Sequence, residues 1–342
     1  MRRSRLVSIA LALLCAGSLM AQETGIVRGG ELPGPLPLFP PGNWWNLDIR
    51  SAPVDPASDA FIAYIGGSRT LHPDFGGDSG LEPPDTLIYG MPYIVVPGTQ
   101  PLVPVVFEYD DESDAGAPGR PVGYPIPEEA KSQTKWIEGG LAGSDPRAEG
   151  DRHMLIVDRD HRILYELYAL EWSAERERWE AGSGAAFSLD SNARRPEGWT
   201  SADAAGLAIL PGLVRWDEVF GPDPIRHAFR VTVRRTNGYV WPASHRAGDS
   251  AGALPMGARL RLKDSTDLSG FPEPVRKIFE AMKTHGLIVA DNGSDMYITG
   301  TYDVRWDNNV LHPAFRSLRA SDFEVVELGW QPSPRRKRPV RR

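Results

Sequence analysis

The sequence predicts a mainly β protein, with antiparallel strands in a sandwich or jelly-roll-like arrangement and a few short helices. Two observations lead to this prediction. Several short segments alternate apolar and polar residues with the period of a strand. Turn-forming residues are abundant, with 35 glycines and 31 prolines in a chain of 342 residues. Such a composition favours many short strands joined by turns over a helical bundle.

The first 21 residues have the three parts of a secretory signal peptide. Three arginines precede the apolar run 6–14, and small residues lead to an expected cleavage site after Ala21. The run is too short to span a bilayer, so we expect an exported protein, periplasmic or extracellular, that does not span the membrane. Cys15, the only cysteine, lies within this segment. The mature chain is therefore expected to have no disulfide and no thiolate nucleophile.

We expect a single β-rich globular domain over residues 44–330. Residues 22–43 are rich in glycine and proline and are typical of an extended leader, whereas residues 331–342 are typical of a disordered basic tail. Removing the three arginines of the signal and the six basic residues of the tail from the formal net charge of −7 leaves −16 for residues 22–330. An acidic body repels polyanions, which argues against nucleic acid as a partner.

Short strands and one helix are expected in the first half of the domain. An aspartate cap and an early proline predict a helix over residues 55–65. Trp44 and Trp45 are neighbours in a strand-like segment, so we expect one of the two side chains to be buried and the other exposed. Apolar patterning predicts five strands, at residues 93–96, 105–109, 153–158, 163–169 and 184–189.

Two strands with a basic face are expected in the second half. Residues 225–234 alternate an apolar face with a mostly basic one, and residues 259–263 do the same. If these strands are neighbours in a sheet, their basic faces would form a groove within the acidic body.

The remaining elements lead to the end of the domain. Residues 271–285 have the apolar spacing of a helix that covers a core. Asn292 and Gly293 predict the turn of a hairpin between strands 287–290 and 296–299. Residues 324–328 are expected to form the last strand.

Two segments could hold a metal ion, and neither has a complete ligand pattern. His72 and Asp74 lie on a loop flanked by glycines, and residues 110–114 form an acidic turn. Two ligands alone are weak evidence for zinc, and the acidic turn lacks the spacing of a calcium loop. We therefore predict no metal site, leave any cofactor unassigned, and expect a solvated acidic turn.

Four segments together resemble an uncharacterised group of secreted, β-rich, mostly bacterial proteins. They are GWTSADAAGL at 198–207, IRHAFR at 225–230, YVWPASH at 239–245 and ADNGSDMYITG at 290–300. The resemblance extends over most of residues 43–327. It implies a secreted globular protein, and it transfers no activity and no site residue.

Most of the residues suited to chemistry lie in the stretch 198–233. Thr200 or Ser201 is expected to start a short helix that includes Asp203 in its first turn. A second short element, residues 212–220, carries Asp217 and Glu218.

The first functional hypothesis is a secreted glycoside hydrolase acting on a polysaccharide. Such an enzyme needs two carboxyl groups across the scissile bond, one protonated and one ionised. The candidates for the acid and the base are Asp203 with Asp217 or Glu218, and Glu166 is a further carboxyl group on the substrate side. Trp199 and Trp216 would stack on sugar rings. We expect Asp203→Asn and Glu218→Gln to abolish turnover with the melting temperature nearly unchanged.

Two other classes of function stay open. A polysaccharide lyase would neutralise a uronate carboxylate with arginines such as Arg230 and move a proton with His227 or His245. A glycan-binding or cell-envelope protein without catalysis would use the same charges for hydrogen bonds and ion pairs. In the hydrolase, His227, Arg230 and His245 would position the substrate or stabilise charge. Walker, dinucleotide-binding and zinc patterns are absent from the sequence.

Overall fold

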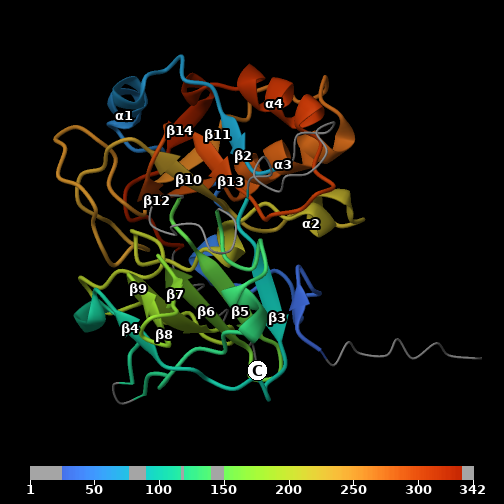
Figure 1. Cartoon of the computed structure of the whole chain (residues 1–342). Coiled ribbons are helices and arrows are strands. Elements are labelled where there is room, and N and C mark those ends of the chain that lie inside the picture. Colours follow the sequence, from blue (N-terminus) through green and yellow to red (C-terminus); the bar gives the residue numbers. More distant parts are fainter. Residues whose placement is uncertain (1–24, 77–89, 117–118, 140–149, 333–342) are drawn as a thin grey trace, which may run out of the picture.

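The computed structural model describes residues 25–76, 90–116, 119–139 and 150–332 (Figure 1). The expected signal peptide, residues 1–21, lies outside the described residues, as do residues 333–342 of the expected basic tail. Two regions of β-sheet lie one above the other in Figure 1. The helices α1, α3 and α4 lie around the upper region.

A six-stranded sheet forms the upper region of Figure 1, in the order β14-β11-β12-β10-β13-β2. Parallel and antiparallel neighbours are mixed, because β10 is parallel to β12 and antiparallel to β13. Most of its strands come from the second half of the chain. The strands are β2 (His72–Asp74), β10 (Phe229–Val233), β11 (Arg259–Leu262), β12 (Leu287–Asn292), β13 (Tyr297–Thr299) and β14 (Phe323–Val325).

A five-stranded sheet and a three-stranded sheet form the lower region. The larger sheet has the order β1-β3-β5-β6-β9 and the smaller has the order β4-β8-β7. The strands of the larger sheet are β1 (Val27–Arg28), β3 (Tyr93–Val96), β5 (Met154–Asp158), β6 (Ile163–Tyr168) and β9 (Ser183–Ser188). Those of the smaller sheet are β4 (Val105–Phe107), β7 (Glu171–Ser173) and β8 (Arg178–Ala181).

Four α-helices complete the described part of the chain: α1 (Ser58–Ile65), α2 (Trp216–Phe220), α3 (Glu273–Thr284) and α4 (Asn308–Ser317). The apolar face of α3 includes Val275, Ile278 and Met282, which are buried against the six-stranded sheet. This periodic spacing is the reason that the helix was predictable from sequence. None of the described helices is long and apolar enough to cross a membrane.

The hydrophobic core continues on both faces of the five-stranded sheet. Alternate residues of β5 point to opposite sides, with Leu155 in one cluster and Ile156 in the other. The leader contributes to the first of these clusters through Leu32 and Leu38, and β1 pairs with β3. Residues 25–43 are thus packed on the fold.

The mainly β fold class is confirmed, and antiparallel pairings are more numerous than parallel ones among the described strands. The jelly-roll arrangement and the single-domain boundaries stay predictions. The segment 171–181 contains two further strands that the sequence analysis did not predict, β7 and β8, which pair with each other.

The expected hairpin after α3 is wrong. The strands β12 and β13 do not pair with each other, because β10 lies between them and pairs with both. The Asn292-Gly293 turn therefore connects strands that lie on either side of β10.

The expected basic groove is also wrong. The strand β12 separates β10 from β11, and Arg259 and Arg261 are buried. Their guanidinium groups donate to backbone carbonyls of the segment 44–52, and Arg261 also pairs with Glu324. These arginines hold the N-terminal segment on the sheet.

Two predictions of local structure are wrong. Trp44 and Trp45 form one turn of 3₁₀ helix, so they do not alternate as in a strand, and both are buried. Residues 200–205 form turns in place of a helix, because the Ser201 hydroxyl accepts from the backbone N–H of Asp203 and donates to the carbonyl of Leu207.

Candidate functional site

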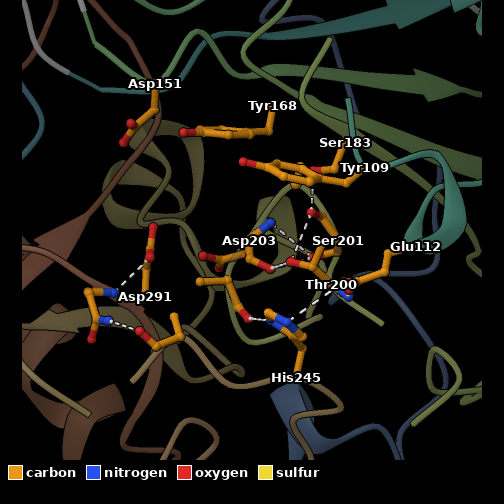
Figure 2. Close-up of a pocket in the computed structure, with 14 residues that line it drawn as sticks. Tyr109, Glu112, Asp151, Tyr168, Ser183, Thr200, Ser201, Asp203, His245 and Asp291 are labelled. Atoms are coloured by element: carbon orange, nitrogen blue, oxygen red, sulfur yellow. Dashed lines mark hydrogen bonds and ion pairs between the residues drawn. The ribbon is translucent and has the colours of Figure 1, made fainter. Parts of the chain in front are cut away.

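A polar cleft of about 500 Å³ lies between the six-stranded and five-stranded sheets. Figure 2 shows its side chains converging from β6, β9, β12 and the segment 200–204. Four carboxylates and two tyrosines are among the residues that line it, and none of the described lining residues is a lysine or an arginine. Its polar residues include Tyr109, Glu112, Asp151, Tyr168, Ser183, Thr200, Ser201, Asp203, His245 and Asp291.

Arg230 lies beneath the cleft and holds two of its carboxylates. Its Nε and Nη2 atoms donate to the two oxygens of Asp203, each at 2.9 Å, and Nη2 also donates to Asp291 Oδ2 at 2.8 Å. Nη1 donates to the hydroxyl of Thr299 at 2.9 Å. Arg230 is only 3% exposed. One guanidinium thus balances two carboxylates in a buried place, which leaves excess negative charge at the cleft floor.

Asp291 is a carboxyl group of the cleft whose pKa is raised by burial. Burial raises the pKa of Asp291 to about 6, with Arg230 opposing the rise and the charge of Asp203 adding to it. Its side chain is 22% exposed, so solvent reaches it from the cleft. Asp291 is therefore partly protonated near neutral pH while facing the cleft.

Asp151 lies across the same cleft and is exposed. In Figure 2 its carboxylate points into the space that Tyr168 and Asp291 also face. Burial first, and then the charges of Asp151 and Asp291 among others, raise the pKa of the Tyr168 phenol. The cleft thus combines an exposed carboxylate, a partly protonated one and a phenol.

A second acidic group lies close to this floor. Burial raises the pKa of Asp74 to about 6, and the charges of Glu138 and Asp151 add to the rise. Asp74 belongs to β2, beside Thr299 of β13. The sequence suggested a loop at His72–Asp74, whereas these residues form an edge strand, and His72 stacks on Tyr297.

His153 balances part of this negative charge. Its Nδ1 lies 2.5 Å from Glu138 Oε2, and its Nε2 lies 3.1 Å from the carbonyl oxygen of Ala202. Both nitrogens face acceptors, so the arrangement favours the doubly protonated ring. Burial alone would lower the pKa of His153, but the charge and hydrogen bond of Glu138 raise it to about 9.

We expect the stability of the protein to depend on pH through His153. Because the folded pKa of about 9 lies above the ordinary value of 6.5, the stabilisation is complete below about pH 6.5 and is lost as pH rises through 9. The difference between the two pKa values corresponds to about 3 kcal/mol. Urea unfolding at pH 6.5 and pH 9.5 measures it, and His153→Gln should remove most of the difference. An equal pH response in the variant would contradict this role.

Glu112 and His245 form the rim of the cleft opposite Asp151. Glu112 Oε2 accepts from the backbone N–H of Thr200 at 3.0 Å and lies 3.7 Å from His245 Nε2. His245 Nδ1 lies 2.8 Å from the carbonyl oxygen of Ala204. His245, predicted as a substrate-binding residue, does line the cleft.

The predicted acid and base pair is not brought together. Asp203 lines the cleft between the sheets, whereas Asp217, Glu218 and His227 line a separate pocket of about 210 Å³. There Glu218 contacts His227 Nε2 at 2.9 Å and Arg215 Nη2 at 2.8 Å. Burial would raise the pKa of Glu218, but Arg215 and His227 hold it below its ordinary value.

The two predicted tryptophans lie outside the cleft. Trp199 lies beside the guanidinium groups of Arg120 and Arg195, and Trp216 stacks on Phe220 under Arg305. Neither tryptophan is among the residues that line the cleft.

Glu166 is fully buried and accepts from the backbone N–H groups of Ile209 and Leu210. Burial raises the pKa of Glu166 to about 7, although these hydrogen bonds oppose the rise. Glu166 is thus a strand carboxyl group with a raised pKa, but a substrate cannot reach its buried side chain.

The acidic turn at residues 110–114 is only partly solvated. Asp114 is fully buried and pairs with Arg195 at 2.8 Å and Arg120 at 2.9 Å. No group of three or more histidine, cysteine, aspartate or glutamate residues in the described part of the chain is arranged to hold a metal ion.

Asp151 and Asp291 were not among the residues that the sequence singled out. Asp291 follows the buried run of β12 and Asp151 precedes β5, so each lies where a strand meets a loop. Asp291 was interpreted only as part of a turn. Their position at the end of a strand was the only feature of the sequence that could have indicated a site residue, and many other residues share that position.

Comparisons with family models, curated proteins and solved structures find no match to this chain.

Proposed function

We propose that the protein is a glycoside hydrolase whose active site is the cleft between the two sheets. The observation that carries this proposal is the pair formed by Asp151 and Asp291, which line one cleft in different environments. Asp291 has a pKa raised by burial, and Asp151 is exposed. Glycoside hydrolysis needs two such carboxyl groups with divided roles.

In this proposal Asp291 protonates the glycosidic oxygen as the bond to the anomeric carbon breaks. Asp151 acts as the ionised partner, either removing a proton from the attacking water or attacking the anomeric carbon itself. Arg230 is a positioning residue, because it fixes the Asp291 carboxyl group and donates to its Oδ2 at 2.8 Å. The phenols of Tyr109 and Tyr168 offer flat rings and hydroxyl groups to a sugar.

The charge of the cleft supports a neutral glycan over a uronate-containing one. A lyase needs a cation that neutralises the substrate carboxylate. None of the described residues that line the cleft is an arginine or a lysine, and Arg230 beneath it is already paired with two aspartates. A hydrolase acting on a neutral polysaccharide is therefore favoured over the lyase.

A screen of the purified protein against neutral and uronate-containing polysaccharides tests the proposal. Release of reducing ends without absorbance from an unsaturated uronate is the expected result. Both signals together would favour the lyase. Retention on a polysaccharide without cleavage would favour a glycan-binding or cell-envelope protein.

A further inference from the structure

A second pocket, of about 250 Å³, lies on the six-stranded sheet and is lined by three arginines. Arg69 follows the end of α1, and Arg234 and Arg235 follow the end of β10. Two further lining residues matter here, Tyr64 of α1 and Asp295 of the turn between β12 and β13. Segments distant in the sequence thus bring positive charge to one hollow.

The charge of these arginines is only partly compensated. Asp295 Oδ2 lies 3.9 Å from Nε of Arg69 and 3.9 Å from Nε of Arg234, at the outer limit of an ion pair. The other oxygen of Asp295 accepts from the backbone N–H of Arg234 at 2.8 Å. No residue of the described part of the chain pairs with the guanidinium of Arg235. Three cations therefore face one carboxylate.

The arginines are available to a ligand. The side chains of Arg69 and Arg234 are 52% and 61% exposed, and Asp295 is 11% exposed. Exposed pairs at such distances contribute little to stability. Since like charges repel, three guanidinium groups that share one carboxylate leave a repulsion that a bound anion would relieve.

Tyr64 adds an aromatic face to the same pocket. Tyr64 is 43% exposed, and its ring lies beside Gly252. A tyrosine ring beside guanidinium groups suits a ligand that has both a flat or apolar face and an anionic group. Sugars that carry a phosphate, sulfate or carboxylate group have both.

We propose that the pocket of Arg69, Arg234 and Arg235 binds an oxyanion group, either as a free inorganic anion or attached to a sugar. Guanidinium groups bind such oxygens through paired, charge-assisted hydrogen bonds. The site is separate from the cleft, shares no lining residue with it, and does not depend on its chemistry. The body of the protein is acidic, so this pocket is a local exception to its charge.

Calorimetric titration of the full protein with inorganic phosphate at constant ionic strength tests the site. We expect saturable binding that weakens at least about tenfold, about 1.4 kcal/mol, in the double variant Arg234→Gln/Arg235→Gln. The matched control is Arg276→Gln, which removes an arginine that lies 3.7 Å from Glu280 on the surface of α3. All the substituted side chains are at least partly exposed, so the variants should fold, and their melting temperatures verify this.

Glucose 6-phosphate and glucose distinguish the two sources of the oxyanion. Tighter binding of glucose 6-phosphate than of phosphate, reduced by Tyr64→Leu, would support a sugar-linked anion. Equal binding of the two, unaffected by Tyr64→Leu, would support a free anion. Equal affinity of phosphate for wild type and the double arginine variant, or no saturable binding, would overturn the proposal.

Discussion

Replacing Arg230 by glutamine is expected to lower the free energy of unfolding by about 3–5 kcal/mol. The substitution leaves the carboxylates of Asp203 and Asp291 without their shared cation in a place where Arg230 itself is 3% exposed. Desolvated charge without a partner is among the most destabilising changes in a protein interior. Urea unfolding at pH 7 measures the change.

Two further variants test the cause of this effect. Arg234→Gln removes an exposed arginine just beyond β10 and should change the free energy of unfolding by less than about 0.5 kcal/mol. In Arg230→Gln/Asp203→Asn one unpaired carboxylate is also removed, so the double variant should be more stable than the sum of the single changes by about 1 kcal/mol or more. Strict additivity would contradict the shared ion pair.

The same ion pair corrects an expectation from the sequence. Asp203→Asn was expected to leave the melting temperature nearly unchanged, but Asp203 is fully buried and accepts two hydrogen bonds from Arg230. We now expect this variant to be destabilised, and a loss of its activity would not identify a catalytic residue.

The largest expected effect on activity comes from the two cleft aspartates. Asp151→Asn and Asp291→Asn should each lower kcat about 10²- to 10⁴-fold on the polysaccharide that the protein cleaves, since each removes one partner of the acid–base pair. Asp59→Asn on α1 is the matched control, because Asp59 is exposed and lies outside the cleft. Reducing-end assays with all three variants provide the comparison.

Two controls keep this prediction specific. The melting temperature of Asp151→Asn should stay close to that of wild type, because Asp151 is exposed. Glu218→Gln should retain activity, since Glu218 lines a different pocket. Full activity in both cleft variants, or loss of activity in Glu218→Gln without loss of folding, would remove the assignment of the cleft.

Local patterns in the sequence predicted elements that depend on local forces. The apolar spacing of residues 271–285 matches α3, and the apolar run 93–96 matches β3. The same local patterns could not predict which strands pair when they lie far apart in the sequence. The Asn292-Gly293 turn is a strong hairpin signal, but β10 comes from about 60 residues earlier in the chain and pairs with both flanking strands.

The site was only partly predictable for the same reason. The stretch 198–233 does supply Asp203 and Arg230, but Asp151 and Asp291 come from other segments. Alternation along residues 225–234 indicated a basic face, whereas Arg230 is buried against acidic partners from two other segments. A sequence pattern shows which residues share a face of a strand, but it does not show what packs against that face.

The pH dependence of kcat/KM tests the central claim most directly. If Asp291 must be protonated to act as the acid, activity is full below its pKa of about 6 and falls tenfold per pH unit above it. We predict this basic limb in wild type and in Asp59→Asn, and its absence from the residual activity of Asp291→Asn. A kcat/KM that stays constant from pH 5 to pH 8 in wild type would contradict the account.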